Sequence, residues 1–255
     1  MLLRVLGGQG AWPSATQACS GFVVEHDGFR LVIDLGYVAF PRLLDGCEAH
    51  EVDAVFISHG HPDHCADLNP LLRARALGEV ACEAMPIYAP VDALNAVLAL
   101  DRPGMLDDAY ALREFVPGAA FEIGPFQVES RLLPHWLPNA GIRLTAGGTV
   151  LAYTGDTGPS PEIARLAHGA DLLIADASYP ERVPADASAY QSSAAQAGQH
   201  AAAAHARRLL LTHLSPGTSR QAALDAARQA FSPAGSAPEI AIAIADDGLV
   251  IDLNT

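Results

Sequence analysis

The residues best suited to chemistry lie in the segment ISHGHPDHCAD, residues 57–67, where three histidines and an aspartate fall within six positions: His59, His61, Asp63 and His64. Imidazole nitrogens and carboxylate oxygens are the ligands that borderline divalent ions such as zinc prefer. The mostly apolar run before them, residues 52–58, is typical of a buried strand. Side chains on the turn after this strand would fan outward from one small surface. The segment therefore predicts a metal site rather than a solvated polar turn.

Three further candidate ligands, His135, Asp156 and His213, each come shortly after a run that predicts a strand. Open sheets place their binding sites at the carboxyl ends of strands, so these residues are expected near the first group. Together the seven side chains supply enough ligands for two divalent ions. Two such ions roughly 3.5–4 Å apart can share a bridging hydroxide with a pKa near 7. The same pair of charges stabilises an oxyanion or a phosphoryl transition state.

The elements that must position these side chains alternate between apolar strand-like runs and helical patterns. Strands are predicted near Ile87 and Phe121 and over residues 2–6, 21–25, 29–34, 52–58, 126–133, 142–144, 149–153, 171–175 and 209–212. Helices are predicted over residues 67–77, 91–100, 160–169, 194–206 and 218–231. The alternation predicts a layered α/β fold, organised as one domain over residues 1–255.

Turn signals complete this outline. Asp27-Gly28 and Gly147-Gly148 predict hairpins within residues 21–34 and 142–153, because such pairs adopt the positive φ angles of tight turns. Asp247-Gly248 predicts a closing hairpin between residues 240–244 and 249–253. The polar, proline-punctuated residues 179–193 predict a mobile loop over the site.

The combined motifs resemble the metallo-β-lactamase fold family, and most closely its ribonuclease Z and phosphodiesterase branch. The resemblance is carried by His-x-His-x-Asp-His at residues 59–64, the distant His135, Gly-Asp-Thr-Gly at residues 155–158 and Leu-Thr-His at residues 211–213. It extends from LRVLG at residues 3–7, through VIDLG at residues 32–36, to the last histidine. It implies a four-layer αβ/βα sandwich and, by the habit of the relatives, a homodimer.

The resemblance also implies roles for the candidate residues. One metal ion would be held by His59, His61 and His135, the other by Asp63, His64 and His213, with Asp156 bridging the two. Asp63 would in addition take part in catalysis. Asp34 would steady the histidine-rich loop from behind the ligands, or else it is an ordinary carboxylate at a strand end. The ions would be zinc, with manganese and iron as alternatives, since availability as well as ligand type decides occupancy.

Two departures from the family narrow the substrate. Ribonuclease Z proteins carry a protruding arm for tRNA between the third-motif histidine and the bridging aspartate, but here His135 and Asp156 are only 21 residues apart. The family's acidic-Ala-Thr/Ser motif is matched by Asp176-Ala177-Ser178, which makes Asp176 a second catalytic candidate. The histidine that the family pairs with this acid to protonate the leaving group is replaced by Gln191, which has no titratable proton near neutral pH.

Composition limits the partners. The chain has 255 residues, 15 arginines, no lysine and a formal net charge of −14. Binding of a polyanion such as tRNA depends on many lysine and arginine contacts to phosphates, so a nucleic-acid partner is not expected. The first residues lack a secretory signal, no apolar run reaches the roughly 20 residues of a membrane span, and the four cysteines match no metal or redox spacing. We expect a cytoplasmic protein without a membrane partner.

These features predict a dinuclear-metal-dependent hydrolase, and in particular a phosphodiesterase that attacks a small, cyclic-nucleotide-like substrate with a metal-bridging hydroxide. One alternative is a ribonuclease Z-like endoribonuclease that processes tRNA 3′ ends. Another is an acyl hydrolase, such as a thioesterase, lactonase or β-lactam-type enzyme, because the same two-metal pocket serves acyl chemistry in this superfamily. A third is a metal-bound regulatory protein whose activity has faded with the change to Gln191.

A first prediction concerns the leaving group. If the leaving-group step lacks a general acid, Gln191→His should raise kcat on phosphodiesters with poor leaving groups, toward the roughly 10²–10⁴-fold that general acid catalysis contributes. A matched substrate with a nitrophenolate leaving group should respond little, because that group departs without a proton. Steady-state kinetics on the two substrates measures the difference. An equal response on both, or none on either, would contradict the prediction.

Overall fold

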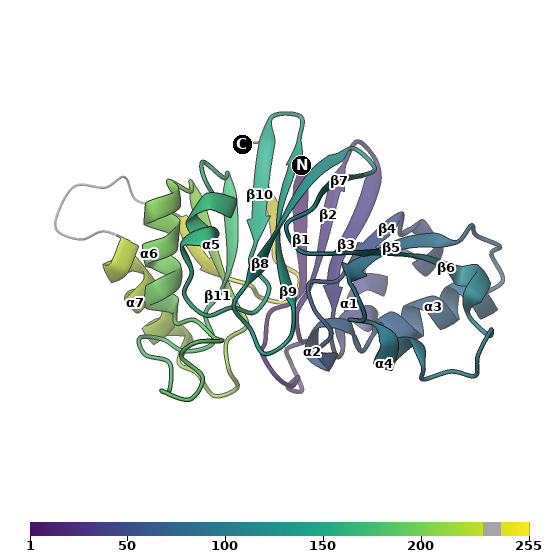
Figure 1. Ribbon diagram of the computed structural model, residues 1–255, viewed down its shortest axis with the longest axis horizontal. Helices are drawn as coiled ribbons and strands as arrows, with labels where there is room; N and C mark the ends of the chain where they lie inside the picture. The colour runs from purple at the N-terminus through teal and green to yellow at the C-terminus, as the bar shows by residue number, and fades with distance from the viewer. Residues whose placement is uncertain (232–240, 255) are drawn as a thin grey trace.

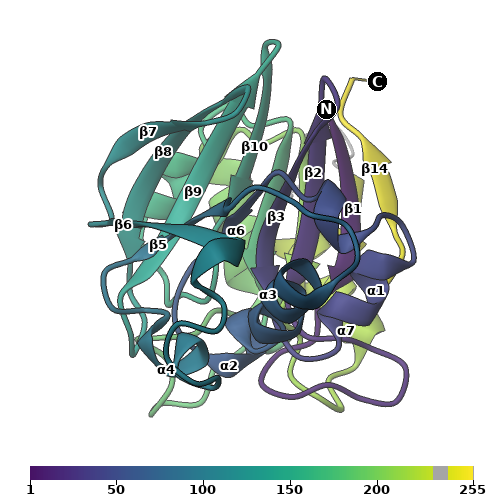
Figure 2. The ribbon, with the colours of Figure 1, turned by 90° about the vertical axis from the view of Figure 1, so that its right-hand side faces the viewer.

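The computed structural model describes residues 1–231 and 241–254. Two seven-stranded sheets face each other within it, and helices cover the outer side of each sheet (Figures 1 and 2). The layered α/β class and the four-layer αβ/βα arrangement predicted from the sequence are therefore confirmed.

The first sheet has the order β14-β1-β2-β3-β4-β5-β6. The pairs from β14 to β3 are antiparallel and those from β3 to β6 are parallel. Its strands are β1 (Leu2–Gly7), β2 (Gly21–His26), β3 (Phe29–Leu35), β4 (Ala54–Phe56), β5 (Met85–Pro90), β6 (Tyr110–Phe115) and β14 (Val250–Asp252). The helices in this part of the chain are α1 (Ala39–Leu44), α2 (Pro62–Cys65), α3 (Leu68–Leu77) and α4 (Asn95–Leu98).

The second sheet has the order β13-β12-β11-β10-β9-β8-β7. The pairs from β13 to β10 are parallel and those from β10 to β7 are antiparallel. Its strands are β7 (Ala120–Ile123), β8 (Phe126–Leu133), β9 (Asn139–Ala146), β10 (Thr149–Tyr153), β11 (Leu172–Asp176), β12 (Arg208–Thr212) and β13 (Ala241–Ile244). The helices in this part are α5 (Pro161–Leu166), α6 (Ala194–Ala204) and α7 (Arg220–Phe231).

Three apolar layers hold the sandwich together. The central layer lies between the sheets and includes Phe22 from the first and Tyr153 from the second, whose ring centroids are 5.3 Å apart. The two outer layers lie between each sheet and its helices. Strands β4 and β11 are buried along their whole length because a helix layer covers one face and the opposite sheet covers the other. This double coverage explains why both strands read as continuous apolar runs.

The alanine-rich composition of α6 has a packing reason. A Cβ atom on Gly198 of this helix would lie 2.4 Å from the carbonyl oxygen of Ala227 on α7. Only small residues permit such a close approach of the two helix backbones. The predicted alanine-rich helix is thus confirmed, and its composition serves the contact with α7.

The predicted closing hairpin is wrong. Strand β13 pairs in parallel with β12 in the second sheet, and β14 pairs antiparallel with β1 in the first, so residues 245–249 cross between the sheets. The acidic turn is held by distant partners: the Asp247 carboxylate accepts hydrogen bonds from the Ala18 N–H (3.1 Å) and the Arg42 Nε–H (3.1 Å). The first predicted residue of this hairpin, at position 240, lies outside the described residues.

Two other expectations needed correction. A helix is predicted over residues 91–100, but the structure has only the four residues of α4. Asp92 adopts a left-handed φ of 64°, and the chain turns there instead of beginning a helix. Helix α1 and the edge strand β6 were not predicted. The hairpins at residues 21–34 and 142–153 are confirmed by their registers, with Glu25 opposite Arg30 and Leu144 opposite Leu151.

The central layer generates a stability prediction. Phe22→Ala should lower the free energy of unfolding by about 3–5 kcal/mol, because it removes a fully buried ring from between the sheets. Leu100→Ala, at a residue that is 67 % exposed, should change it by less than about 0.5 kcal/mol. Urea denaturation followed by circular dichroism measures both. Equal effects would show that Phe22 does not join the two sheets.

Candidate metal centre

The structure brings all seven candidate ligands to one place, at the carboxyl ends of strands from both sheets. Four of them follow β4 of the first sheet, two on the loop into α2 and two in α2 itself: His59 and His61, then Asp63 and His64. The second sheet contributes the three that follow β8, β10 and β12: His135, Asp156 and His213. The ligand atoms fall into two groups, within each of which they lie within 4.8 Å of one another.

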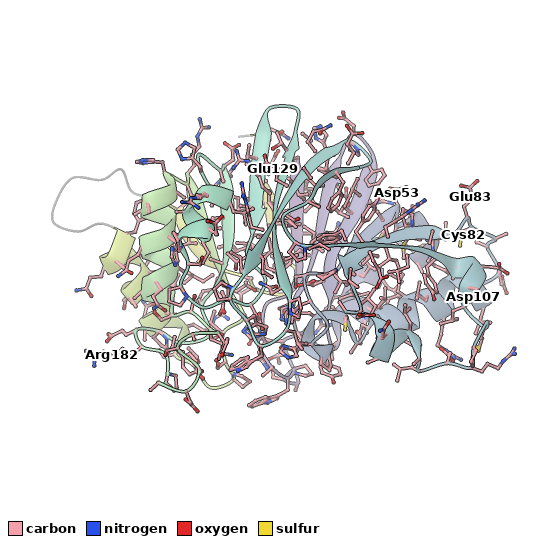
Figure 3. The ribbon with its side chains drawn as sticks, viewed as in Figure 1. Asp53, Cys82, Glu83, Asp107, Glu129 and Arg182 are labelled. Atoms are coloured by element: carbon pink, nitrogen blue, oxygen red, sulfur yellow. The ribbon has the colours of Figure 1, made fainter. Side chains whose placement is uncertain are left out.

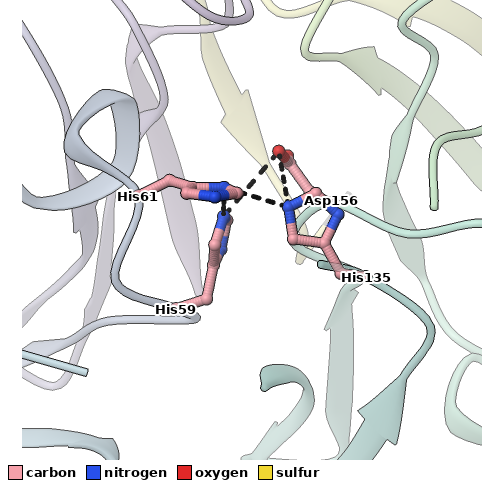
Figure 4. Close-up of side chains that lie close together, drawn as sticks. All are labelled: His59, His61, His135 and Asp156. Carbon is pink, nitrogen blue, oxygen red and sulfur yellow. Dashed lines mark hydrogen bonds and ion pairs between the residues drawn. The ribbon is translucent and has the colours of Figure 1, made fainter. Parts of the chain in front are cut away.

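The first group consists of His59, His61, His135 and Asp156 (Figure 4). The His61 Nδ1 atom lies 3.0 Å from His59 Nε2 and 3.0 Å from His135 Nε2. The Asp156 Oδ2 atom lies 3.8 Å from His59 Nε2 and 3.7 Å from His135 Nε2. Three imidazole nitrogens and one carboxylate oxygen thus point at a common centre.

The second group consists of Asp63, His64, Asp156 and His213. The His213 Nε2 atom lies 3.2 Å from Asp63 Oδ2 and 3.1 Å from Asp156 Oδ2. The other oxygen of Asp156, Oδ1, lies 3.1 Å from His64 Nε2. Asp156 belongs to both groups, which is the position that the resemblance assigned to a bridging ligand.

The nitrogen and oxygen atoms of the two groups are better placed to coordinate divalent cations than to form hydrogen bonds with one another. His64 Nε2 and Asp156 Oδ1 are both buried, and neither has an aligned hydrogen-bond partner within the described residues although they are 3.1 Å apart. Buried polar atoms without partners are costly, so something else must satisfy them. Nitrogen and oxygen atoms that converge in this way are a suitable ligand set for zinc or a related ion. The cluster is therefore able to bind metal.

Burial and charge act in opposite directions on the imidazoles. Burial and the neighbouring His64 lower the pKa of His59 well below its usual value. Burial also disfavours protonated His64, but the Asp156 and Asp34 carboxylates outweigh it and raise the pKa of His64 well above its usual value. In the same way, Asp156 overcomes burial and raises the pKa of His213 to about 9. The buried carboxylates thus create a field that favours positive charge, which protons or metal ions supply.

Asp34 lies directly behind the ligands and is fully buried. Its Oδ2 atom lies 2.7 Å from His64 Nδ1 and accepts hydrogen bonds from the Ser58 and Tyr153 hydroxyls at 2.8 and 2.7 Å. Its Oδ1 atom accepts from the Ser58 N–H at 2.7 Å. The contact with His64 orients the ring so that Nε2 faces the cluster. Of the two interpretations offered for Asp34, the geometry favours the support of the histidine-rich loop.

Asp176 lies behind His213 and does not face the ligand atoms directly. The Ser178 hydroxyl donates to Asp176 Oδ1 at 2.7 Å and lies 3.0 Å from His213 Nδ1. The backbone N–H groups of Thr157 and Ser192 donate to Asp176 Oδ2. Burial raises the pKa of Asp176 to about 6. The carboxylate therefore positions His213 through Ser178, and its catalytic role stays a prediction.

Gln191 lies between Tyr190 and Ser192 on the segment of residues 179–193. A bridge between Tyr179 and Ser193 closes this segment at its base, and the Tyr190 carbonyl lies 2.9 Å from His135 Nδ1. Within the described residues the half-buried Gln191 side chain makes no hydrogen bond. The segment thus reaches the ligand cluster as expected, while its mobility and the role of Gln191 stay predictions.

Sequence reasoning missed several supporting groups. The Asn139 amide donates to the carbonyls of Thr154 and Asp156, which fixes the backbone of the central ligand. The Ala11 N–H donates to Asp63 Oδ2 at 2.8 Å, so the glycine-rich loop at residues 7–13 supports a ligand. Ser58 and Ser178 lie within recognised motifs, which was the available signal for them. Asn139 and Ala11 lie outside those motifs, and nothing in their residue type or spacing indicates a contact with a ligand.

None of the cysteines belongs to either ligand group. Cys65 is buried, contacts the His61 carbonyl oxygen through Sγ at 3.3 Å, and burial raises the pKa of its thiol to about 12. Cys82 lies at the far end of the molecule in Figure 3, on the connection between α3 and β5. All four thiols are free.

Comparison with known proteins identifies the class. Residues 32–214 match the model of the beta-lactamase superfamily domain. The chain is 32 % identical to an uncharacterized protein of Mycobacterium leprae, over 90 % of this chain and 83 % of the relative. It is 26 % identical to the ribonuclease Z of Methanopyrus kandleri, over 98 % of this chain and 97 % of the relative.

Solved structures agree. The crystal structure of the metallo-beta-lactamase fold protein YhfI from Bacillus subtilis superposes with a TM-score of 0.86 at 27 % identity, over 98 % of each chain. The chain therefore belongs to the beta-lactamase superfamily and has the metallo-β-lactamase fold. No helix among the described residues is long and apolar enough to cross a membrane.

The contact behind His213 generates a prediction about metal affinity. Ser178→Ala removes the hydroxyl between His213 and Asp176, so the affinity of the protein for zinc should fall about 10–100-fold. Ser188→Ala, at an exposed serine bonded to the Ala185 carbonyl, should leave it unchanged. Competition with a chromophoric chelator measures both affinities. Equal affinities for the two variants would show that Ser178 does not position His213.

Proposed function

We propose that the chain is a metal-dependent phosphodiesterase that hydrolyses a small, cyclic-nucleotide-like phosphodiester. The observation that supports this most directly is the pair of ligand groups that share Asp156. In this proposal one divalent ion would be held by His59, His61 and His135, and the other by Asp63, His64 and His213. Asp156 would serve both. Zinc is the proposed metal, with manganese and iron as alternatives. When bound, the ions would supply Lewis acidity and allow water to act as the nucleophile at neutral pH.

Asp63 is the carboxylate best placed to act on the reacting water. Its side chain is 10 % exposed, whereas those of Asp156 and Asp34 are 4 % and 0 % exposed. The Ala11 N–H and His213 both contact its Oδ2 atom, and these contacts fix the carboxylate at the edge of the cluster. Asp63 would therefore orient the attacking water and accept its proton. The buried Asp34 and Asp176 hold His64 and His213 in place.

The described structure supports a small substrate over a large polyanion. The chain between His135 and Asp156 forms only β9, β10 and their connecting turn, so it offers no protruding arm for tRNA. The net charge is −14, and exposed acidic side chains such as Asp53, Asp107 and Glu129 stand around the outside of the molecule (Figure 3). Such a surface repels a long phosphate backbone. The proposal includes a cytoplasmic location, as expected from the sequence, and a homodimer, as the resemblance implies.

The second candidate is a ribonuclease Z-like activity, which the similarity to the Methanopyrus kandleri protein favours. An acyl hydrolase remains the third, because the same ligand set polarises acyl and phosphoryl oxygens alike. The first two cleave a phosphodiester bond in substrates of very different size, whereas the third cleaves an acyl bond. A panel of bis-p-nitrophenyl phosphate, 3′,5′-cyclic AMP, a tRNA precursor, a thioester and a lactone separates them.

Two histidine variants, one inside and one outside the ligand groups, test the candidate metal site. His135→Ala should abolish hydrolysis of bis-p-nitrophenyl phosphate and lower the metal content, because it removes a ligand of the first group. His168→Ala, at an exposed histidine outside both groups, should retain wild-type activity and metal. Initial rates and elemental analysis of the purified proteins measure both effects. Full activity of the His135 variant, or wild-type protein that turns over the thioester or tRNA precursor but no small phosphodiester, would overturn the proposal.

A further inference from the structure

The chain has only two tryptophans, Trp12 and Trp136, and both are exposed. Trp136 directly follows the candidate ligand His135, and its side chain is 50 % exposed. Tyr190, from the segment that contacts His135, is 36 % exposed. Large aromatic side chains left open to water commonly mark a ligand or partner surface. The position of Trp136 and Tyr190 beside the metal centre points to a role in substrate binding.

The two rings form a supported surface. The Trp136 and Tyr190 ring centroids are 5.0 Å apart with an interplanar angle of 33°, and the His135 ring lies 5.1 Å from Trp136 at 68°. The Tyr190 carbonyl in turn lies 2.9 Å from His135 Nδ1. Trp136 is therefore held between two neighbours that are themselves linked. A ring that is already held in place loses little freedom when a ligand stacks on it.

A pocket adjoins this surface. It has a volume of about 460 Å³ and is lined by His135 and Trp136 together with Leu132, Leu133, Pro134, Leu137, Pro138 and Ser160. The volume lies within the range of small-molecule sites, and the lining is mostly apolar. Such walls suit a flat, weakly polar ring system and do not suit a second phosphate.

We propose that Trp136 and Tyr190 form a stacking platform for the planar base of a nucleotide substrate. This inference rests on the proposed function, since it names the part of the substrate that lies beyond the phosphodiester. In a nucleotide, one sugar separates the phosphate from the base. Because the Trp136 ring lies 5.1 Å from the ring of His135, a phosphodiester at the ligand cluster would bring its base within reach of Trp136. Aromatic side chains stack on all bases because every base presents a π face.

The acidic character of the protein fits this mode of recognition. A cyclic nucleotide carries a single negative charge, which ions held by the ligand cluster would neutralise. The remaining contacts must then be made without lysine, which the chain lacks. Stacking supplies affinity for the base that needs no positive charge, and it distinguishes a nucleotide from a sugar phosphate.

Fluorescence tests the platform without turnover. In metal-loaded Trp12→Phe protein, Trp136 is the remaining tryptophan and reports on its own surface. Adenosine 5′-monophosphate should quench its emission to saturation, because the base stacks on the indole. Ribose 5-phosphate should bind through its phosphate and leave the emission unchanged. Equal responses to the two ligands, or no response to the nucleotide, would overturn the proposal.

Binding measurements give a second, independent test. Trp136→Ala should weaken the calorimetric Kd for adenosine 5′-monophosphate about tenfold or more, while the Kd for ribose 5-phosphate stays within about twofold. Trp136→Phe should recover part of the loss because it keeps a ring. Val116→Ala, at a 70 % exposed residue that does not line the pocket, should change neither Kd. Equal weakening of both ligands would reduce Trp136 to a support for His135 and would overturn the platform.

The two proposals fail in different ways. If the platform is right and the reaction is not phosphodiester hydrolysis, adenosine 5′-monophosphate still quenches Trp136 but no small phosphodiester in the panel is cleaved. If the reaction is right and the platform is wrong, bis-p-nitrophenyl phosphate is hydrolysed and Trp136→Ala leaves the discrimination between the nucleotide and ribose 5-phosphate unchanged.

Discussion

The buried carboxylate of Asp34 is the contact on which the arrangement of the metal centre depends. A charged group in the interior is tolerated only when hydrogen bonds satisfy it, and here Ser58 and His64 come from the first sheet while Tyr153 comes from the second. The same contacts fix the loop after β4 and the short helix α2, which together carry four of the candidate ligands. Asp34 adopts a left-handed φ of 54°, a conformation that a non-glycine residue retains only when its surroundings hold it there.

The fold could be predicted from the sequence where local patterns decide it. The ligand-bearing runs before His59, Asp156 and His213 are short, apolar and followed by turn residues, so their ends were visible without knowledge of the topology. The closing strands were paired incorrectly because Asp247 finds its partners at Ala18 and Arg42, more than two hundred residues away. Helix α4 was overextended because the left-handed conformation of Asp92 has no sequence signal as strong as glycine.

The candidate site, like the fold, could be predicted from the sequence only in part. The expected seven residues do come together, because each one follows a strand and the carboxyl ends of these strands meet at one edge of the sandwich. The groups that support them could be found only in part. Ser178 belongs to a recognised motif, whereas Asn139, which fixes the backbone at Asp156 from the neighbouring strand β9, lies outside every motif. Asp176 links both regions, since it reaches His213 through Ser178 and the segment of Tyr190 through the Ser192 N–H.

The division of the ligands between the two sheets has a consequence for biosynthesis. A nascent chain that has emerged only as far as residue 212 contains every ligand of the first group but lacks His213 from the second. Occupation of the second ligand group would then require translation of His213 followed by docking of both halves. Cations bound between the two sheets would favour the docked state over the open one, so metal uptake would be a late step that stabilises the assembled fold. Without metal, the contact between the two sheets would be the least stable part of the protein.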